Sequence, residues 1–265
     1  MHVDDLNYKS LRVTLQDRSC FIRLQRLGNN NSIDGVMIRE LTDLYSRLSQ
    51  SAITVAILEG SSEVFCSGAD FKLISGERMQ DDELMLDPAQ LYELWLLMTT
   101  APLITVSHVT GSVNAGGMGF IAASDLVIAN TSATFCLSEL LFGLIPACVM
   151  PFLIRRIGVS EAHYLALSSI TITAESAKNC GLVNVCDSHS NQLLRRHLSR
   201  LEKLSKKTIS RYKSFINELA PIPNSMKEIA VRTNKEVFTD AENLHAINEF
   251  VSNGIYPWEN TKYAE

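Results

Sequence analysis

Hydrophobic and polar residues alternate along the first part of this chain and later repeat at helical spacing. The alternation over residues 11–25, interrupted by polar residues near Asp17, predicts two short strands joined by a turn. Apolar residues recur at helical spacing over residues 36–48, which predicts an amphipathic helix. Further apolar, β-branched runs that end in small-residue turns predict buried strands, and they cover residues 54–58, 103–108 and 125–129.

The end of the chain is predicted to be helical. One long amphipathic pattern covers residues 192–219, and two shorter patterns cover residues 226–237 and 244–251. Strands that alternate with helices favour a parallel sheet with right-handed β–α crossovers, so the predicted fold class is α/β. We expect a core over residues 1–191 and a helical region over residues 192–265.

Composition and charge narrow the classes of protein to consider. The 265 residues are 46% hydrophobic, which is enough for one large domain or for a domain with a helical appendage. No apolar run reaches the length of a membrane span and residues 1–10 lack a signal-peptide core, so a cytoplasmic protein without membrane contact is expected. A net charge of −5 argues against general nucleic-acid binding. The six cysteines lack zinc-ligand spacing, so we expect core thiols and no metal site.

Two glycine-containing turns carry the first candidate chemistry. They cover residues 65–71 and 111–119, and each follows an apolar strand. Glycine lets the backbone come close to a ligand, and free N–H groups from two neighbouring turns can point at one oxygen. The pair therefore predicts either an oxyanion hole or two tight turns without chemistry.

Five motifs in order resemble the enoyl-CoA hydratase (crotonase) family. Residues 65–71 resemble its F-x-x-G-A-D-I turn, and residues 135–146 resemble its F-x-x-P-E-x-x-x-G-x-x-P run. The opening loop and helix at 26–41, the glycine turn at 111–125 and the A-x-x-A-x-x-x-G-L-V run at 174–183 complete the set. The resemblance implies a crotonase-type spiral of ββα turns with a helical C-terminal trimerisation region, assembled as a homotrimer or a dimer of trimers.

The same resemblance implies which residues act. Ala69 and Gly116 correspond to the two backbone donors that hold a thioester oxygen while an enolate forms. Glu139 corresponds to one of two catalytic glutamates, and its apolar neighbours predict burial and a raised pKa; an exposed helix-cap carboxylate is the alternative. Gly119 stands where hydratases have the second glutamate. One carboxylate must therefore do both proton transfers, or another polar group must assist.

The assisting group is expected near Gly119. Asn114 is the preferred candidate because it precedes Gly119 in the same turn, and a turn-capping amide is its alternative interpretation. The other candidates are Asp70, Ser138 and His108, of which His108 is expected to be structural. The residues implied to bind the substrate or its pantetheine arm are Asn31, Cys66, Gly68, Asp70 and Lys72.

A second resemblance runs nearly the whole length of the chain. Residues 113–120, 137–149, 153–158 and 256–259 are similar to the polyketide biosynthesis enoyl-CoA hydratases. It implies a dehydratase of the β-branching cassette, which converts a 3-hydroxy-3-methylglutaryl group on an acyl carrier protein to 3-methylglutaconyl. The substrate is then carried on the phosphopantetheine of that protein, and no other cofactor is implied.

Two features favour a carrier-protein substrate over free coenzyme A. Leu27 and Gly28 stand where free-CoA hydratases commonly have Pro-Lys. Residues 195–213 contain eight basic residues and one acid, which suits an acidic carrier protein but equally a solvated helix face or a subunit contact. The expected docking residues are Arg200, Lys203, Lys206, Lys207 and Arg211.

Several alternatives stay open at this point. Arg155, Arg156 and Lys72 are all candidates for contacting the distal carboxylate of the substrate. The chain could instead be an enoyl thioester isomerase, which also needs one glutamate, or the decarboxylase of the same cassette. The loss at Gly119 also suits a non-catalytic crotonase-fold binding protein, although the retained Glu139 and both turns favour an enzyme.

Overall fold

The strands form two sheets in the computed structural model, which describes residues 7–76 and 85–259. The larger sheet has the order β1-β2-β3-β5-β7-β10, and the smaller one has the order β4-β6-β8-β9. All neighbours are parallel except β1 with β2 and β8 with β9. The strands are β1 (Leu11–Gln16), β2 (Ser19–Leu24), β3 (Val55–Glu59), β4 (Val64–Cys66), β5 (Ile104–Val109), β6 (Ser112–Asn114), β7 (Leu126–Ala129), β8 (Thr134–Cys136), β9 (Ile172–Thr173) and β10 (Val185–Cys186).

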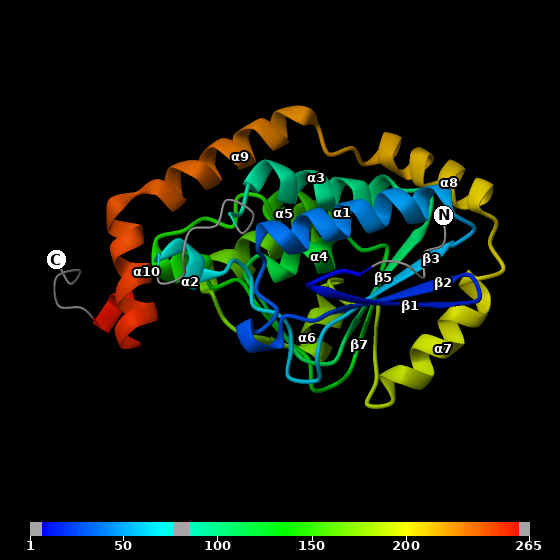
Figure 1. Cartoon of the computed structure of the whole chain (residues 1–265), viewed down its shortest axis with the longest axis horizontal. Helices are drawn as coiled ribbons and strands as arrows, with labels where there is room; N and C mark the ends of the chain where they lie inside the picture. Colours follow the sequence, from blue (N-terminus) through cyan, green and yellow to red (C-terminus); the bar gives the residue numbers. More distant parts are fainter. Residues whose placement is uncertain (1–6, 77–84, 260–265) are drawn as a thin grey trace.

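A ββα unit repeats along the chain. Each of β3, β5 and β7 in the larger sheet is followed by β4, β6 or β8 in the smaller sheet, and then by a helical segment (Figure 1). The predicted spiral of ββα turns is therefore confirmed. The helices are α1 (Gly35–Gln50), α2 (Phe71–Ile74), α3 (Pro88–Thr100), α4 (Gly117–Ala123), α5 (Met150–Ser168), α6 (Ala174–Asn179), α7 (Ser190–Leu201), α8 (Lys206–Leu219), α9 (Asn224–Thr239) and α10 (Ala241–Asn253), with short 3-10 turns η2 (Leu27–Asn29), η3 (Glu139–Phe142) and η4 (Pro257–Glu259).

Most local predictions are confirmed by these bounds. The predicted hairpin is β1 and β2, and Asp17 at their turn has a φ of 52°. The strands predicted at 54–58, 103–108 and 125–129 are β3, β5 and β7, within one residue at either end. The short strands of the smaller sheet were not predicted, because three-residue runs carry too little periodicity.

The prediction of one helix over residues 192–219 is wrong. The structure has two helices there, α7 and α8, separated at Glu202–Ser205. Ser205 begins α8 as its N-cap, since its side chain accepts a hydrogen bond from the N–H of Thr208. Glu202 is the C-cap residue of α7. Its backbone carbonyl accepts a hydrogen bond from the side chain of Arg18, and its carboxylate accepts one from the hydroxyl of Ser19 in the larger sheet.

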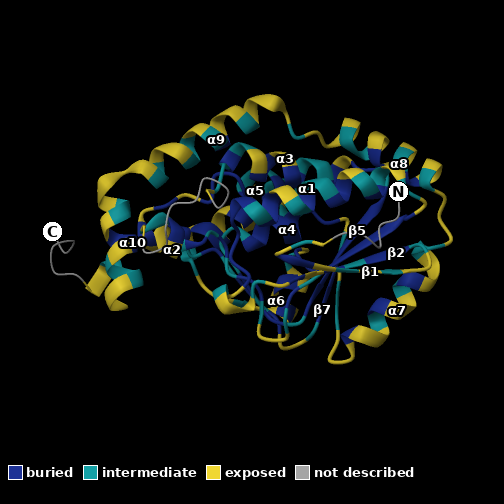
Figure 2. Ribbon diagram, in the orientation of Figure 1, coloured by how far each residue is buried: buried dark blue, intermediate teal, exposed yellow. Residues whose placement is uncertain are grey.

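The core lies between the sheets and helices α1, α3, α4 and α5. Its largest fully buried side chains include Trp95, Tyr45, Phe120 and Phe152. Figure 2 shows buried residues concentrated on the sheet and on α4, whereas α9 is largely exposed. In the described part of the chain, no helix is long and apolar enough to cross a bilayer.

A second, smaller apolar cluster positions the C-terminal helices. Ile247 of α10 is fully buried against Phe142 and Leu144, and Phe71 of α2 packs on the same cluster. Phe142 makes edge-to-face contacts with Phe71 at 5.2 Å and with Phe250 at 5.1 Å. The end of the chain is thereby held over α2 and η3, where the candidate site lies.

Candidate active site

A cavity of about 850 Å³ opens where the smaller sheet, η3 and the C-terminal helices meet. Both glycine turns line it, as do residues of α2, α3, α10 and η4. Its volume is in the range of sites for small-molecule ligands. Of the residues expected to act, Ala69, Gly116, Asn114 and Glu139 all line it, so the structure brings together four positions far apart in the sequence.

The two glycine turns contact each other directly. Gly68 has a φ of +90°, and a Cβ placed on it would lie 2.7 Å from the Cβ of Ala115 and 3.0 Å from the N of Gly116. A side chain is excluded there by both conformation and space, which explains the glycine. The close approach brings the N–H groups of Ala69 and Gly116 to the same wall of the cavity.

These two N–H groups have no acceptor in the part of the chain that the structure describes. The extended loop at Ile33 pairs with the turn around Ala69, through Ile33 N–H to the Gly68 carbonyl at 2.7 Å and Asp70 N–H to the Ile33 carbonyl at 3.3 Å. Within residues 7–76 and 85–259, neither Ala69 nor Gly116 donates its N–H to another group. Two free donors on one cavity wall are the arrangement that an oxyanion hole requires.

Glu139 is a buried carboxylate at the start of η3. Its side chain lines the cavity, the residue is 7% exposed, and its Oε2 has no hydrogen-bond partner in the described part of the chain. Burial, which disfavours the charged form, raises the pKa of Glu139 to about 7. The alternative of an exposed helix-cap carboxylate is therefore excluded, and a group with this pKa can both take and return a proton near neutral pH.

A family model for enoyl-CoA hydratase/isomerase matches residues 15–261 of this chain. The chain belongs to the enoyl-CoA hydratase/isomerase family. The prediction that it is a hydratase-like enzyme with the crotonase fold is thereby confirmed.

Individual relatives agree with this assignment. The chain is 42% identical to a bacillaene synthase dehydratase, PksH, from Bacillus subtilis, over 97% of this chain and 99% of the relative. A crystal structure of a B. subtilis polyketide biosynthesis enoyl-CoA hydratase superposes with a TM-score of 0.89 over 95% of this chain and 100% of that one. An enoyl-CoA hydratase/isomerase from Mycobacterium paratuberculosis, at 20% identity and a TM-score of 0.82 over 92% and 99% of the two chains, shares the fold.

Asn114 ends β6 and faces this hydratase-family cavity. Its Oδ1 is buried and has no hydrogen-bond partner among the described residues, so the turn-capping interpretation of that oxygen is not supported. Ser138, the N-cap residue of η3, lines the cavity as well. His108 does not line it: Nδ1 lies 2.8 Å from Glu59 and Nε2 lies 3.0 Å from Ser190, as expected for a structural histidine.

Asp70 is part of a buried ion cluster with Arg26 and Asp34. Arg26 Nη2 lies 2.8 Å from Asp34 and 3.1 Å from Asp70, and the Ser32 hydroxyl donates to Asp70 at 3.0 Å. The cluster fixes the loop at Ile33 that pairs with Ala69. Asp70 borders the cavity but is paired with Arg26, which it shares with Asp34, whereas Glu139 has no ion pair with a cation in the described part of the chain.

Three residues expected to bind the substrate lie behind the cavity wall. Asn31 is fully buried and donates to the carbonyls of Val64 and Phe65 while accepting from the N–H of Arg26. Cys66 is also fully buried, and burial raises the pKa of its thiol to about 12. Asn31, Cys66 and Gly68 do not line the cavity, so the expectation of direct ligand contact is corrected: they shape the turn that carries Ala69.

The structure distinguishes among the three residues expected to contact the distal carboxylate of the substrate. Arg156 donates to the carbonyls of Leu182 and Ser124, and Arg155 donates to Asn217. Neither arginine lines the cavity. Among the described lining residues, Lys72 on α2 is the one cation, so it is the candidate that geometry retains.

The proposed docking residues lie on helices distant from the cavity in this chain. Figure 1 shows α7 and α8 at the end of the molecule opposite α2 and α10. Lys206 is engaged by the carbonyls of Leu48 and Ser51, whereas Lys203 and Lys207 are exposed. Carrier-protein docking through this face remains a prediction, and in a single chain it would leave the substrate far from Glu139.

Sequence reasoning missed the aromatic part of the wall. Phe142, Phe250, Tyr256 and Trp258 line the cavity, and Tyr256 stacks on Trp258 at 4.7 Å. Trp95 lines it from α3. The ending at 256–259 was noted only as a resemblance, and no periodicity in the sequence indicates that these rings meet across more than a hundred residues.

Proposed function

We propose that this chain is the dehydratase that removes water from a 3-hydroxy-3-methylglutaryl group on an acyl carrier protein, giving 3-methylglutaconyl, in polyketide β-branching. The observation that carries the proposal is that the buried Glu139 lines the same cavity as two N–H donors that have no acceptor among the described residues. The similarity to the bacillaene synthase dehydratase PksH supports the reaction class. The substrate itself is our inference.

In the proposed reaction, Glu139 transfers the proton and the two N–H donors stabilise the enolate. The carboxylate of Glu139 takes a proton from the carbon next to the thioester, and the electrons of that C–H bond move to the thioester oxygen. The N–H groups of Ala69 and Gly116 stabilise the resulting enolate; one such donor typically contributes about 3–4 kcal/mol to the transition state. As the enolate collapses, the bond from the β-carbon to its hydroxyl breaks, and the proton now on Glu139 passes to the leaving oxygen to form water.

One carboxylate suffices in this scheme because it gains and then returns the same proton. Its pKa of about 7 suits both steps. Asn114, which lines the same cavity, is proposed to hold the leaving hydroxyl near Glu139 by hydrogen bonding. Asp70 cannot share the proton transfers at low cost, since it is paired with Arg26.

The proposal extends to the carrier of the substrate and to the assembly of the protein. A substrate on a phosphopantetheine arm needs no other cofactor for this reaction. Lys72, at the cavity, is proposed to meet an anionic group of the substrate. A homotrimer or a dimer of trimers is proposed from the family resemblance, and native mass spectrometry tests the number of protomers.

The reaction is tested by intact mass. The purified chain is incubated with 3-hydroxy-3-methylglutaryl-carrier protein, and the carrier is followed by mass spectrometry. The proposal predicts the loss of one water. In a separate incubation with 3-methylglutaconyl-carrier protein, loss of carbon dioxide would instead identify the decarboxylase, and a shifted double bond, detected by NMR because the mass is unchanged, would identify an isomerase. A carrier protein that binds but never changes would favour the non-catalytic alternative.

A further inference from the structure

Ala115 has a backbone conformation that residues with a side chain rarely adopt. Its φ is 48°, in the left-handed region, and it lies between Asn114 and Gly116 in the second glycine turn. The other non-glycine residues with a left-handed φ in the described part of the chain are Asp, Asn or Ser, whose polar side chains can form local hydrogen bonds; they are Asp17, Asn30, Asn31 and Ser169. Ala115 has no such compensation, so its conformation is held at a cost in stability.

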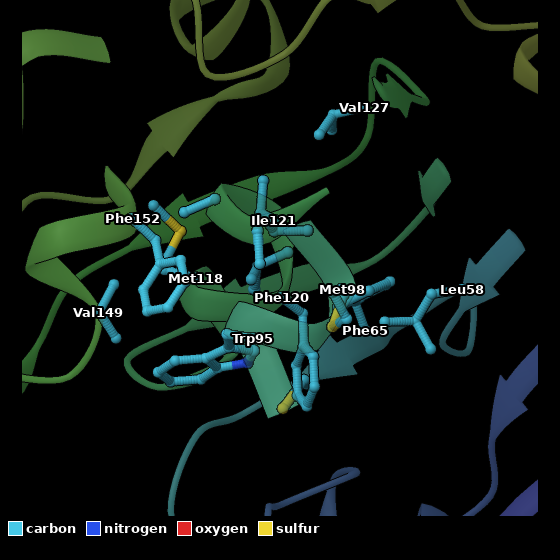
Figure 3. Close-up of a cluster of buried hydrophobic side chains, with 14 of the residues drawn as sticks. Leu58, Phe65, Trp95, Met98, Met118, Phe120, Ile121, Val127, Val149 and Phe152 are labelled. Atoms are coloured by element: carbon cyan, nitrogen blue, oxygen red, sulfur yellow. The ribbon is translucent and has the colours of Figure 1, made fainter. Parts of the chain in front are cut away.

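Contacts on both sides hold the backbone of Ala115. Before it, β6 pairs with β8, and the N–H of Ala115 donates to the carbonyl of Cys136 at 3.1 Å. After it, the carbonyl of Ala115 accepts from the N–H of Met118 at 2.9 Å. Met118, Phe120 and Ile121 then anchor α4 in the core, as Figure 3 shows. A strained residue persists where the surrounding structure fixes it in this way, and such residues concentrate at functional sites.

The methyl group of Ala115 links the two glycine turns. It is the atom nearest to the place where a Cβ on Gly68 would lie, at 2.7 Å, so the methyl group lies against the backbone of Gly68. A Cβ built on Gly116 would in turn lie 3.6 Å from the Cα of Gly68 and 3.8 Å from the N of Ala69. The contact therefore joins the segment that carries one N–H donor to the segment that carries the other.

A glycine in place of Ala115 would lack both constraints. Glycine adopts the left-handed conformation without strain but is equally free to leave it. It also has no methyl group to contact Gly68. The chain therefore has, on the wall of the cavity, a residue that costs stability and restricts the motion of both turns.

We propose that Ala115 is a positioning residue whose methyl group and left-handed backbone hold the N–H groups of Ala69 and Gly116 in a fixed relation to each other. This role rests on the proposed dehydratase function, in which both N–H groups bind the thioester oxygen. Donors that are aligned before the reaction need no reorganisation while charge develops on that oxygen. Loss of their alignment is therefore expected to lower kcat.

Ala115→Gly tests this role with two measurements. In the substrate-free protein, ¹⁵N relaxation should show the order parameters of the Ala69 and Gly116 amides falling from about 0.85 toward about 0.6. The kcat per folded molecule for dehydration of the 3-hydroxy-3-methylglutaryl-carrier protein should fall about 10-fold, which is less than the roughly 10²- to 10³-fold loss from removing a donor outright. The urea midpoint should equal or exceed that of wild type, because glycine relieves the strain.

Two further variants separate the methyl group from the strain. Ala115→Ser keeps the Cβ, so it should keep the order parameters and most of the kcat of wild type. Asp17→Gly is the matched control, since it also replaces a left-handed residue by glycine, in the exposed turn between β1 and β2, and Asp17 does not line the cavity. Its kcat and the order parameters of both amides should equal those of wild type.

Failure of the proposed function and failure of this role give different results. A wild-type chain that does not dehydrate the substrate would contradict the function, while the order parameters would still decide the role of Ala115. With an active wild type, unchanged order parameters at both amides in Ala115→Gly, or a wild-type kcat in that variant, would overturn the role and leave the function intact.

Discussion

Two regions of this protein bury polar side chains, and they differ in whether those side chains have hydrogen-bond partners. Around the cavity, Glu139 Oε2, Asn114 Oδ1 and Trp95 Nε1 are buried without a hydrogen-bond partner among the described residues. At the far side of the larger sheet, His108 and Lys213 are equally buried but are held by several partners each. Three other buried side-chain oxygens of the described residues, Thr54 Oγ1, Tyr92 Oη and Ser168 Oγ, also lack a partner, but their residues do not line the cavity. Buried polar groups are usually paired, so the unpaired oxygens of Glu139 and Asn114 on the cavity wall are where a ligand is expected to act.

The paired region shows what structural burial looks like in this chain. Lys213 of α8 is 6% exposed, lies 2.7 Å from the Asp125 carboxylate and donates to the carbonyls of Met98 and Leu103. These contacts attach α8 to the end of α3 and to the larger sheet. A group so fully engaged stabilises the fold and is not free for chemistry, which is the contrast that the following predictions test.

The largest effect is expected at the unpaired carboxylate. Glu139→Gln keeps the shape of the side chain but cannot accept the α-proton, so kcat should fall by about 10²- to 10⁴-fold. Dehydration of the carrier-bound substrate measures it. Glu175→Gln is the matched control on an exposed glutamate and should keep wild-type kcat. Near-wild-type turnover in Glu139→Gln would assign the proton transfers to another group.

A substitution in the paired region should change the stability of the protein and not its turnover. Lys213→Met leaves the Asp125 carboxylate without its cation and two backbone carbonyls without a donor, so the free energy of unfolding should fall by about 2–4 kcal/mol. Urea denaturation measures the change, with the exposed Lys207→Met as control. Turnover per folded molecule should be unchanged, and a selective loss of turnover would contradict the division of roles.

The unpaired carboxylate should also make stability depend on pH. The folded-state pKa of Glu139 is raised from 4.5 to about 7, so the folded protein binds this proton more tightly than the unfolded chain. Stability from this group is therefore lost as the pH rises from about 4.5 to about 7. Glu139→Gln should be more stable than wild type by about 3 kcal/mol at pH 8 and by little at pH 4.5. Equal unfolding curves at pH 8 would argue against the raised pKa.

A smaller effect on stability is expected at Gly119, where the indole of Trp95 occupies the space that a side chain would need. Gly119→Ala places a Cβ against Trp95, and such overpacking typically costs about 1–3 kcal/mol. Trp95→Leu makes room, so the cost of Gly119→Ala should shrink in the Trp95→Leu background. A double-mutant cycle on unfolding free energies measures this coupling. Additive effects would show that the two positions do not compete for the same space.

Much of the fold and half of the site follow from local sequence signals. The strands β3, β5 and β7 are apolar runs long enough to identify, and the turns at 65–71 and 111–119 are marked by glycines whose need the structure explains at Gly68. Glu139 could be selected because its motif and its apolar neighbours are contiguous in the sequence.

The rest depends on contacts between distant segments. The pairing of Trp95 with Gly119 joins two helices, and nothing in either helix alone indicates it. Arg155 and Arg156 look available in the sequence, yet partners from other parts of the chain occupy both. The break between α7 and α8 combines a local signal, the Ser205 N-cap, with contacts to Glu202 from Arg18 and Ser19 at the opposite end of the sequence.

The central claim is that one buried carboxylate performs both proton transfers, and the pH dependence of kcat/KM for dehydration tests it most directly. Only the ionised form of Glu139 can begin the reaction, so kcat/KM should rise with pH through a single inflection near 7 and then stay level. A bell-shaped profile, which would require a second group of opposite protonation, or a profile flat across this range would contradict the account.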